Sequence, residues 1–192
     1  MDFILTWLNE GFFHIISFSA IDHLLFILVT VLPYKISEVK KLLWVITSFT
    51  LAHSISLALA FLNIISINNQ LTELLIAFTI LFTCIENIYF KNLTNYRVLI
   101  TGLFGLIHGL GFSSTLSQLF MGMKLNLFET LLPFNIGIEC GQIVVIACLF
   151  ISGFLFSKLK WVNKTITVLF ISWFAAFISI YWIWDRAILL TH

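Results

Sequence analysis

Charged side chains are scarce in this chain. Only 10% of its 192 residues are Asp, Glu, Lys or Arg, whereas 60% are apolar. Soluble domains carry about a quarter of their residues as charged side chains, so this composition excludes an ordinary soluble fold and indicates an integral membrane protein. The net charge of +1 comes from scattered basic residues without a basic run, so no feature favours nucleic acid as a partner.

Cysteine pairs and common enzyme motifs are also missing. The three cysteines, Cys84, Cys140 and Cys148, lie in apolar segments without CxxC spacing, which is typical of small buried hydrophobic residues. The chain has no GxxxxGK[ST] motif, so ATP-driven transport by this chain alone is not expected, and it has neither GxSxG nor HExxH. The first residues lack a positive n-region and a small-residue cleavage site, so no removable signal peptide is predicted.

Long apolar segments dominate what is present. A bilayer core about 30 Å thick needs about 20 apolar residues per helix. Six segments reach this length: 12–33, 43–63, 71–90, 97–121, 128–157 and 162–184. Short polar breaks connect them, and no linker separates domains. The sequence therefore predicts an all-α polytopic membrane protein, with residues 1–192 forming one six-helix bundle in a lipid bilayer.

The distribution of lysine and arginine predicts the orientation of the bundle. With the N-terminus outside, eight of the ten basic side chains fall on the cytoplasmic side, and only Lys124 and Arg186 fall outside. The positive-inside rule then places both termini on the external, periplasmic side of a bacterial inner membrane. Because Arg97 and Lys164, at the ends of their segments, are counted here as loop residues, no lysine or arginine is predicted within the membrane-embedded part of the spans.

A small set of ionisable side chains remains inside the predicted spans. These are His14, Asp22, His23, His53, Glu86, His108 and Glu139. A charge at the bilayer centre costs about 2.5–3.5 kcal/mol, so such residues usually face the bundle interior and have partners. Without lysine or arginine among them, the expected counter-charge is a proton or a bound cation. Residue counting places the set near mid-depth, except Glu86 toward the cytoplasmic end and His14 near the external mouth.

Imidazole and carboxylate together suit divalent transition metals. Nickel, cobalt, zinc and copper(II) accept such ligands, whereas magnesium and calcium prefer oxygen alone. We therefore predict metal ligands at Asp22, His23, His53, Glu86, His108 and Glu139, with His14 as a further ligand at the mouth of the path. Polar neighbours that would orient them are Thr50, Ser54, Asn87, Asn135 and Gln142. Asp22 and His23 point about 100° apart, so one coordinates while the other orients it or serves a neighbouring site.

The stretch GLFGLIHGLGF, residues 102–112, surrounds His108 with glycines. Gly105 and Gly109 form a GxxxG pair, which lets another helix backbone approach closely. Together with Gly111 they are expected to clear the face of His108 for ligands from other helices. The alternative is packing alone, in which His108 only donates one hydrogen bond to a neighbouring helix.

Five ordered motifs resemble the HupE/UreJ family of membrane proteins. They are His14 with IDHLLF (21–26), SFTLAHS (48–54), IEN (85–87), FGLIHGLGFS (104–113) and FNIGIECGQ (134–142). The resemblance covers roughly residues 11–145 and implies a six-helix nickel, or cobalt, permease that supplies hydrogenase or urease maturation. One departure is the spacing between His14 and Asp22, which is seven residues where about five are expected.

Three functions are compatible with these residues. The leading hypothesis is secondary transport of a divalent transition-metal cation, most favourably nickel, with cobalt, zinc and copper as further candidates. The alternative is an intramembrane zinc-dependent hydrolase with the same ligands, and a third is a metal sensor or accessory subunit. A single tight site under a lipid-sized cleft would favour chemistry, whereas a series of polar sites along a path would favour transport. Faces rich in small residues are compatible with a homo-oligomer.

Overall fold

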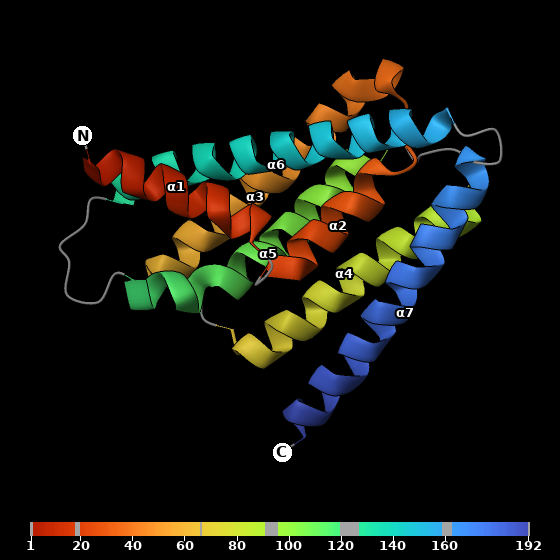
Figure 1. The fold of residues 1–192 in the computed structure, drawn as a ribbon. Coiled ribbons are helices and arrows are strands. Elements are labelled where there is room, and N and C mark those ends of the chain that lie inside the picture. The colour runs from red at the N-terminus through yellow and green to blue at the C-terminus, as the bar shows by residue number, and fades with distance from the viewer. Residues whose placement is uncertain are drawn as a thin grey trace.

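A computed structural model describes residues 2–17, 20–65, 67–90, 96–119, 127–158 and 163–191, without the side chains of residues 2, 113–119 and 127. These residues are helical almost throughout (Figure 1). The elements are α1 (Asp2–Ile16), α2 (Ile21–Val31), the 3-10 turn η2 (Ile36–Glu38), α3 (Val39–Phe61), α4 (Asn69–Tyr89), α5 (Arg97–Leu119), α6 (Leu127–Ser157) and α7 (Lys164–Leu190). The described part of the chain contains no strand, which confirms the all-α prediction.

Several of these helices are long and apolar enough to cross a membrane. Four qualify alone: Ile36–Phe61, Asn69–Tyr89, Phe128–Ser157 and Lys164–Leu190. α1 and α2 qualify only together, and the apolar part of α5 that was tested, Arg97–Phe112, is shorter. The chain is therefore a multi-pass membrane protein with four or five candidate spans. The sixth span and the external position of both termini remain predictions.

The first predicted span, 12–33, is wrong as one continuous helix. α1 ends at Ile16, α2 begins at Ile21, and the two helices are bent by 68° relative to each other. Hydropathy measures how apolar a segment is and carries no information about continuity of the helix. Irregular backbone at membrane depth is tolerated where it lines a cavity instead of lipid. Ser17 and Ala20, at the two sides of this break, line such a cavity.

The helices pack in three close pairs, α1 with α6, α3 with α5, and α4 with α7, while α2 contacts α4, α6 and α7. Figure 1 shows α1 lying along α6 and α4 lying along α7. Glycines bring two of these pairs to backbone contact. A Cβ added to Gly11 would collide with the Phe134 carbonyl of α6, and one added to Gly105 would collide with the Phe49 carbonyl of α3. These contacts fix α1 and α3 in the bundle.

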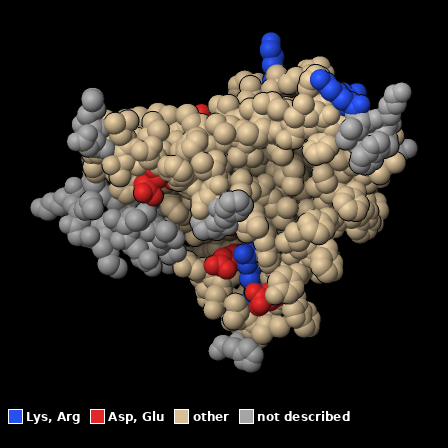
Figure 2. All heavy atoms as spheres, viewed as in Figure 1, with Lys and Arg blue, Asp and Glu red and all other residues tan. Residues whose placement is uncertain are grey.

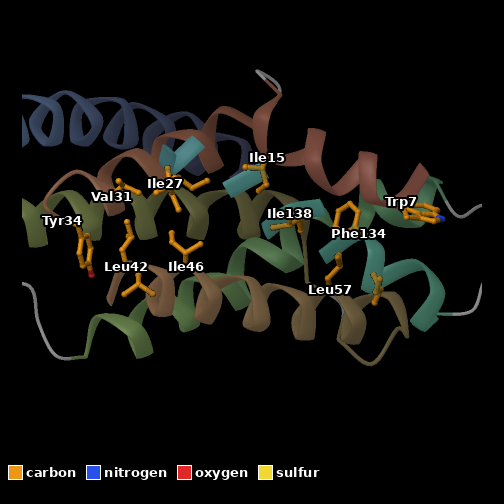
Figure 3. Close-up of a cluster of buried hydrophobic side chains, with 13 residues drawn as sticks. Trp7, Ile15, Ile27, Val31, Tyr34, Leu42, Ile46, Leu57, Phe134 and Ile138 are labelled. Atoms are coloured by element: carbon orange, nitrogen blue, oxygen red, sulfur yellow. The ribbon is translucent and has the colours of Figure 1, made fainter. Parts of the chain in front are cut away.

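Two clusters of buried apolar side chains hold the short helix α2. The first, drawn in Figure 3, includes Ile27 of α2 together with residues of α1, α3 and α6 such as Leu42. The second contains Phe26 of α2 with residues of α3, α4 and α7 such as Phe49. In a bilayer this packing stabilises through dispersion contacts more than through exclusion of water. The middle of α2 is therefore held from both sides.

The surface fits a protein that is surrounded by lipid. Large apolar side chains on α6 and α7 are exposed, among them Phe154, Phe170 and Phe177. On the face shown in Figure 2 most of the described surface carries no charged side chain. Soluble monomers rarely expose contiguous apolar surface on this scale.

Candidate metal centre

A cavity of about 600 Å³ reaches the break between α1 and α2. Its polar wall consists of Glu10, His14, Ser17, Asp22, His23, Glu73, His108 and Arg186, and we call it the acidic cavity. Arg186 pairs with Glu73, with 3.5 Å between Nε and Oε2. Three carboxylates against one guanidinium leave this wall net negative, which attracts cations.

Three histidines from three helices lie close together beside this cavity, and two of them, His14 and His23, line it. His14 lies in the last turn of α1, His23 in the first turn of α2, and His53 within α3. Each offers a ligand atom, and the three atoms lie within 4.8 Å of one another. The ring centroids of His14 and His23 are 4.7 Å apart, and those of His14 and His53 are 5.9 Å apart. Nitrogens bound to one ion lie about 3 Å apart, so a small inward movement would let one cation contact all three.

Each histidine of this triad has at least one buried ring nitrogen without a hydrogen-bond partner among the described residues. Among the described residues, none bonds to Nε2 of His14, Nε2 of His23 or either nitrogen of His53, although all four atoms are buried. Buried polar atoms in folded proteins are nearly always hydrogen-bonded. A histidine kept only for packing would have such a bond to a neighbouring helix. The unpartnered nitrogens of three imidazoles at one point therefore make this a candidate ligand site.

Asp22 orients the His23 ring. Its Oδ1 lies 3.0 Å from His23 Nδ1 and 2.8 Å from the His23 backbone nitrogen. Because an ionised carboxylate only accepts hydrogen bonds, Nδ1 carries the proton and Nε2 keeps its lone pair. Histidine ligands of metals commonly donate their other N–H to a carboxylate in this way. The geometry thus supports His23 as the ligand and Asp22 as the residue that positions it.

His108 lies beside the triad on its α4 side. Its ring centroid is 5.0 Å from that of His23, and its Nε2 is 3.0 Å from Thr79 Oγ1. The Thr79 hydroxyl donates to the Ile76 carbonyl at 2.7 Å, so it accepts from His108 Nε2. His108 Nδ1 then keeps a lone pair, and it has no hydrogen-bond partner in the described part of the chain. A fourth imidazole is therefore available next to the triad.

Neither of the two predicted glutamate ligands belongs to the group formed by the triad. Glu86 is near the far end of α4, where its Oε2 is 3.6 Å from Arg97 NH1. Glu139 is half-buried on α6 and is not among the residues that line the acidic cavity. The prediction that the spans contain neither lysine nor arginine is wrong, because Arg97 begins α5 and is only 2% exposed. Its side chain turns inward to Glu86, which a count of loop residues cannot detect.

The residues that were predicted to orient the metal ligands make hydrogen bonds at different points of the bundle. Thr50 Oγ1 donates to Gln142 Oε1 at 2.8 Å, which ties α3 to α6 one turn before His53. Ser54 Oγ donates to the Thr50 carbonyl at 2.7 Å within α3. Asn87 contacts Arg97, with 3.3 Å between Oδ1 and NH2. The last member, Asn135, has a buried Oδ1 without a hydrogen-bond partner among the described residues.

Glycine contacts set the distance between α5 and α3. A Cβ added to Gly109 would collide with the His53 carbonyl oxygen and with Ser56 Oγ. Gly105 makes the equivalent backbone contact one turn earlier, whereas a Cβ on Gly111 would lie 2.8 Å from Ile76 Cδ1 of α4. Gly105 and Gly109 thus face α3, and Gly111 faces α4. The GxxxG pair brings the His53 backbone close to the helix that carries His108.

The chain matches the family described as HupE / UreJ protein over residues 1–186. No curated protein and no solved structure matches it. The matched range contains the histidine triad, Asp22, His108 and the Glu86–Arg97 pair. Since the match extends over nearly the whole chain, this protein belongs to the HupE/UreJ family of membrane proteins.

Proposed function

We propose that this protein is a secondary transporter of a divalent transition-metal cation, nickel first, and that His14, His23 and His53 bind the cation at the acidic cavity. The observation that carries the proposal is the convergence of three imidazoles, each with a buried ring nitrogen that has no hydrogen-bond partner among the described residues, beside a net negative cavity. Family membership supports the same substrate class, because the HupE/UreJ family suggests nickel or cobalt transport.

The chemistry of the triad supports this choice of cation. Imidazole nitrogens favour nickel, cobalt, zinc and copper over magnesium and calcium. The break between α1 and α2 also resembles the discontinuous helices that form substrate sites in many transporters. His108 offers the next nitrogen, so a cation leaving the triad has a further ligand toward α4. We include Asp22 as the group that orients His23.

The membrane potential supplies enough free energy for such transport. One elementary charge gains about 2.3 kcal/mol in crossing 100 mV, so a divalent cation gains about 4.6 kcal/mol. This corresponds to an accumulation of about three orders of magnitude. In the predicted orientation the cation would enter the cytoplasm of a bacterium through the inner membrane. We propose that it supplies a metalloenzyme such as hydrogenase or urease.

An intramembrane zinc enzyme is the second candidate. Three histidines, one of them oriented by a carboxylate, are also a ligand set of catalytic zinc. Transport is favoured because polar groups continue beyond the triad. His108 is bonded to Thr79, and the buried Thr83 lies one turn further along α4. Such a series suits a path better than a single closed site does.

Nickel uptake by proteoliposomes tests the proposal. The parent protein should load vesicles with Ni²⁺ when an inside-negative potential is applied, and His53→Ala should lower the initial rate about tenfold or more. His192→Ala removes the fifth histidine of the chain and serves as the matched control, with uptake at the parent rate. Equal rates for His53→Ala and the control would contradict the proposed site. Nickel or zinc binding without uptake by the parent protein would contradict transport and favour the enzyme.

A further inference from the structure

Arg97 is surrounded by oxygen atoms at the end of α4 opposite Glu73. Its NH1 lies 3.6 Å from Glu86 Oε2, and its NH2 lies 3.3 Å from Asn87 Oδ1 and 3.4 Å from the Thr30 carbonyl oxygen. Carboxylate, amide and backbone oxygens from α4 and α2 thus face one positive charge. Within the described residues, Thr30 Oγ1 is also buried without a hydrogen-bond partner.

The guanidinium is held loosely in this position. Charge-assisted N–H···O bonds are usually 2.7–2.9 Å long, and all three Arg97 contacts are longer. NH1 is buried but makes no hydrogen bond to any described residue. A buried ion pair stabilises a protein only when its geometry is good. By contrast, Asn87 Nδ2 donates to the Val29 carbonyl at 2.7 Å, so the Asn87 amide is held by a shorter bond than any that the guanidinium makes to these oxygens.

Polar side chains connect this position with the histidines. His108 bonds to Thr79, and Thr83 and Glu86 follow on the same face of α4 at i+4 and i+7. All four residues are buried. The rise from Thr79 to Glu86 is about 10.5 Å along the helix. A row of oxygen ligands therefore leads from the fourth imidazole to the site of Arg97.

A second cavity of about 1020 Å³ lies beyond Arg97. Its wall includes Lys35, Lys41, Arg97 and Lys164 against the single carboxylate Glu38, and we call it the basic cavity. The Tyr34 ring also lines it, with the Arg97 guanidinium carbon 5.5 Å from the ring centroid. Burial raises the pKa of the Tyr34 hydroxyl, which Arg97 opposes, so the ring is uncharged at neutral pH. The cavity thus offers Arg97 room, next to an aromatic face that the guanidinium already contacts in its present position.

We propose that Glu86, Asn87 and the Thr30 carbonyl form a second, all-oxygen cation site, which the Arg97 guanidinium fills until the transported metal arrives. The metal takes the three oxygens from Arg97, and the guanidinium turns into the basic cavity. Oxygen ligands hold nickel less tightly than imidazole does. Passage through a series of sites requires that the last one binds weakly enough to release the ion. The site is therefore suited to release and the histidine triad to capture.

The identity of the cation rests on the proposed function, whereas the oxygen site does not depend on the histidines. Titration calorimetry with Ni²⁺ on the full-length protein in detergent tests it. The parent should bind one Ni²⁺ tightly at the triad. Arg97→Gln should bind a second Ni²⁺, because Glu86 loses its competing cation, and Glu86→Gln with Arg97→Gln should return to one. Lys40→Gln is the control: it removes one exposed positive charge near the start of α3, and this variant should still bind a single Ni²⁺.

A folded Arg97→Gln protein that binds no second Ni²⁺ would overturn the inference. If that variant does not fold, the double variant Glu86→Gln/Arg97→Gln, which removes both charges of the pair, provides the second test. It should keep the parent affinity at the triad but transport nickel at least tenfold more slowly, and transport at the parent rate would overturn the inference. Combining His53→Ala with Arg97→Gln separates the histidine site of the proposed function from the oxygen site. If both sites exist, the combined variant loses the Ni²⁺ at the triad and keeps the one gained at the oxygen site. If the triad does not bind metal, His53→Ala leaves nickel binding of the parent unchanged, yet Arg97→Gln still gains one Ni²⁺.

Discussion

Replacing Gly109 with alanine tests whether the contact between α5 and α3 positions a metal ligand. The added Cβ would collide with the His53 carbonyl oxygen and with Ser56 Oγ, and it would lie 3.0 Å from the His53 carbonyl carbon. The Ser56 side chain can rotate away, but the backbone carbonyl cannot. Helix α3 therefore has to move at the residue that carries the imidazole.

The size of the effect follows from this geometry. Restoring van der Waals distance requires a separation of the helices by about 1 Å, and overpacking of this kind costs about 1–3 kcal/mol. The ratio of folded to unfolded protein then falls by about five- to 150-fold. Metal ligands tolerate displacements of about 0.5 Å, so a shift of His53 should lower nickel affinity about tenfold or more, as loss of a supporting contact does.

Gly153→Ala is the matched control, because no atom lies within 4 Å of a Cβ added to Gly153 of α6. Thermal unfolding in detergent, followed by tryptophan fluorescence, reports stability, and titration calorimetry reports nickel affinity. Gly109→Ala should lower both the thermal stability and the nickel affinity, whereas Gly153→Ala should change neither. If the two variants behave alike in both measurements, the proposed link between the GxxxG contact and the position of His53 is refuted.

Three further predictions concern the same centre. Asp22→Asn should lower nickel affinity about 10- to 100-fold in calorimetry, because His23 loses its orienting carboxylate; the exposed Asp185→Asn should not, and equal affinities would contradict the role of Asp22. Thr50→Val leaves Gln142 Oε1 without the Thr50 donor and should lower the free energy of unfolding by about 1–3 kcal/mol in denaturant titrations; unchanged stability would show that this bond contributes nothing. Lowering the pH should weaken nickel binding in calorimetry, because a proton occupies the imidazole lone pair that the metal needs, and pH-independent affinity would argue against histidine ligands.

Most helix positions were predictable because lipid and core both demand apolar side chains. The predicted segment 71–90 corresponds to α4 at Asn69–Tyr89, and 128–157 corresponds to α6 at Leu127–Ser157. The break in 12–33 was not predictable from hydropathy, since the residues between α1 and α2 leave the average apolar. The serine pair in SFSA, residues 17–20, was the available signal for it.

The residue types of the candidate site were more predictable from the sequence than which of those residues lie together in space. Histidines inside apolar segments stand out because their cost in lipid demands a reason. Which of them meet depends on the bend: in one straight helix His14 and His23 would lie about 13.5 Å apart along the axis, whereas their ring centroids are 4.7 Å apart. The position of Arg97 depends on a long side chain turning inward to Glu86. No pattern along the chain records either of these three-dimensional facts.

The coordination of the bound metal decides most directly whether His14, His23 and His53 bind one cation. X-ray absorption spectroscopy of the nickel-loaded protein should show scattering from three imidazole rings in the first shells. His14→Ala combined with His53→Ala should remove most of that signal, and His192→Ala should leave it unchanged. A nickel shell made of oxygen alone, or a spectrum unaffected by the double substitution, would contradict the histidine site.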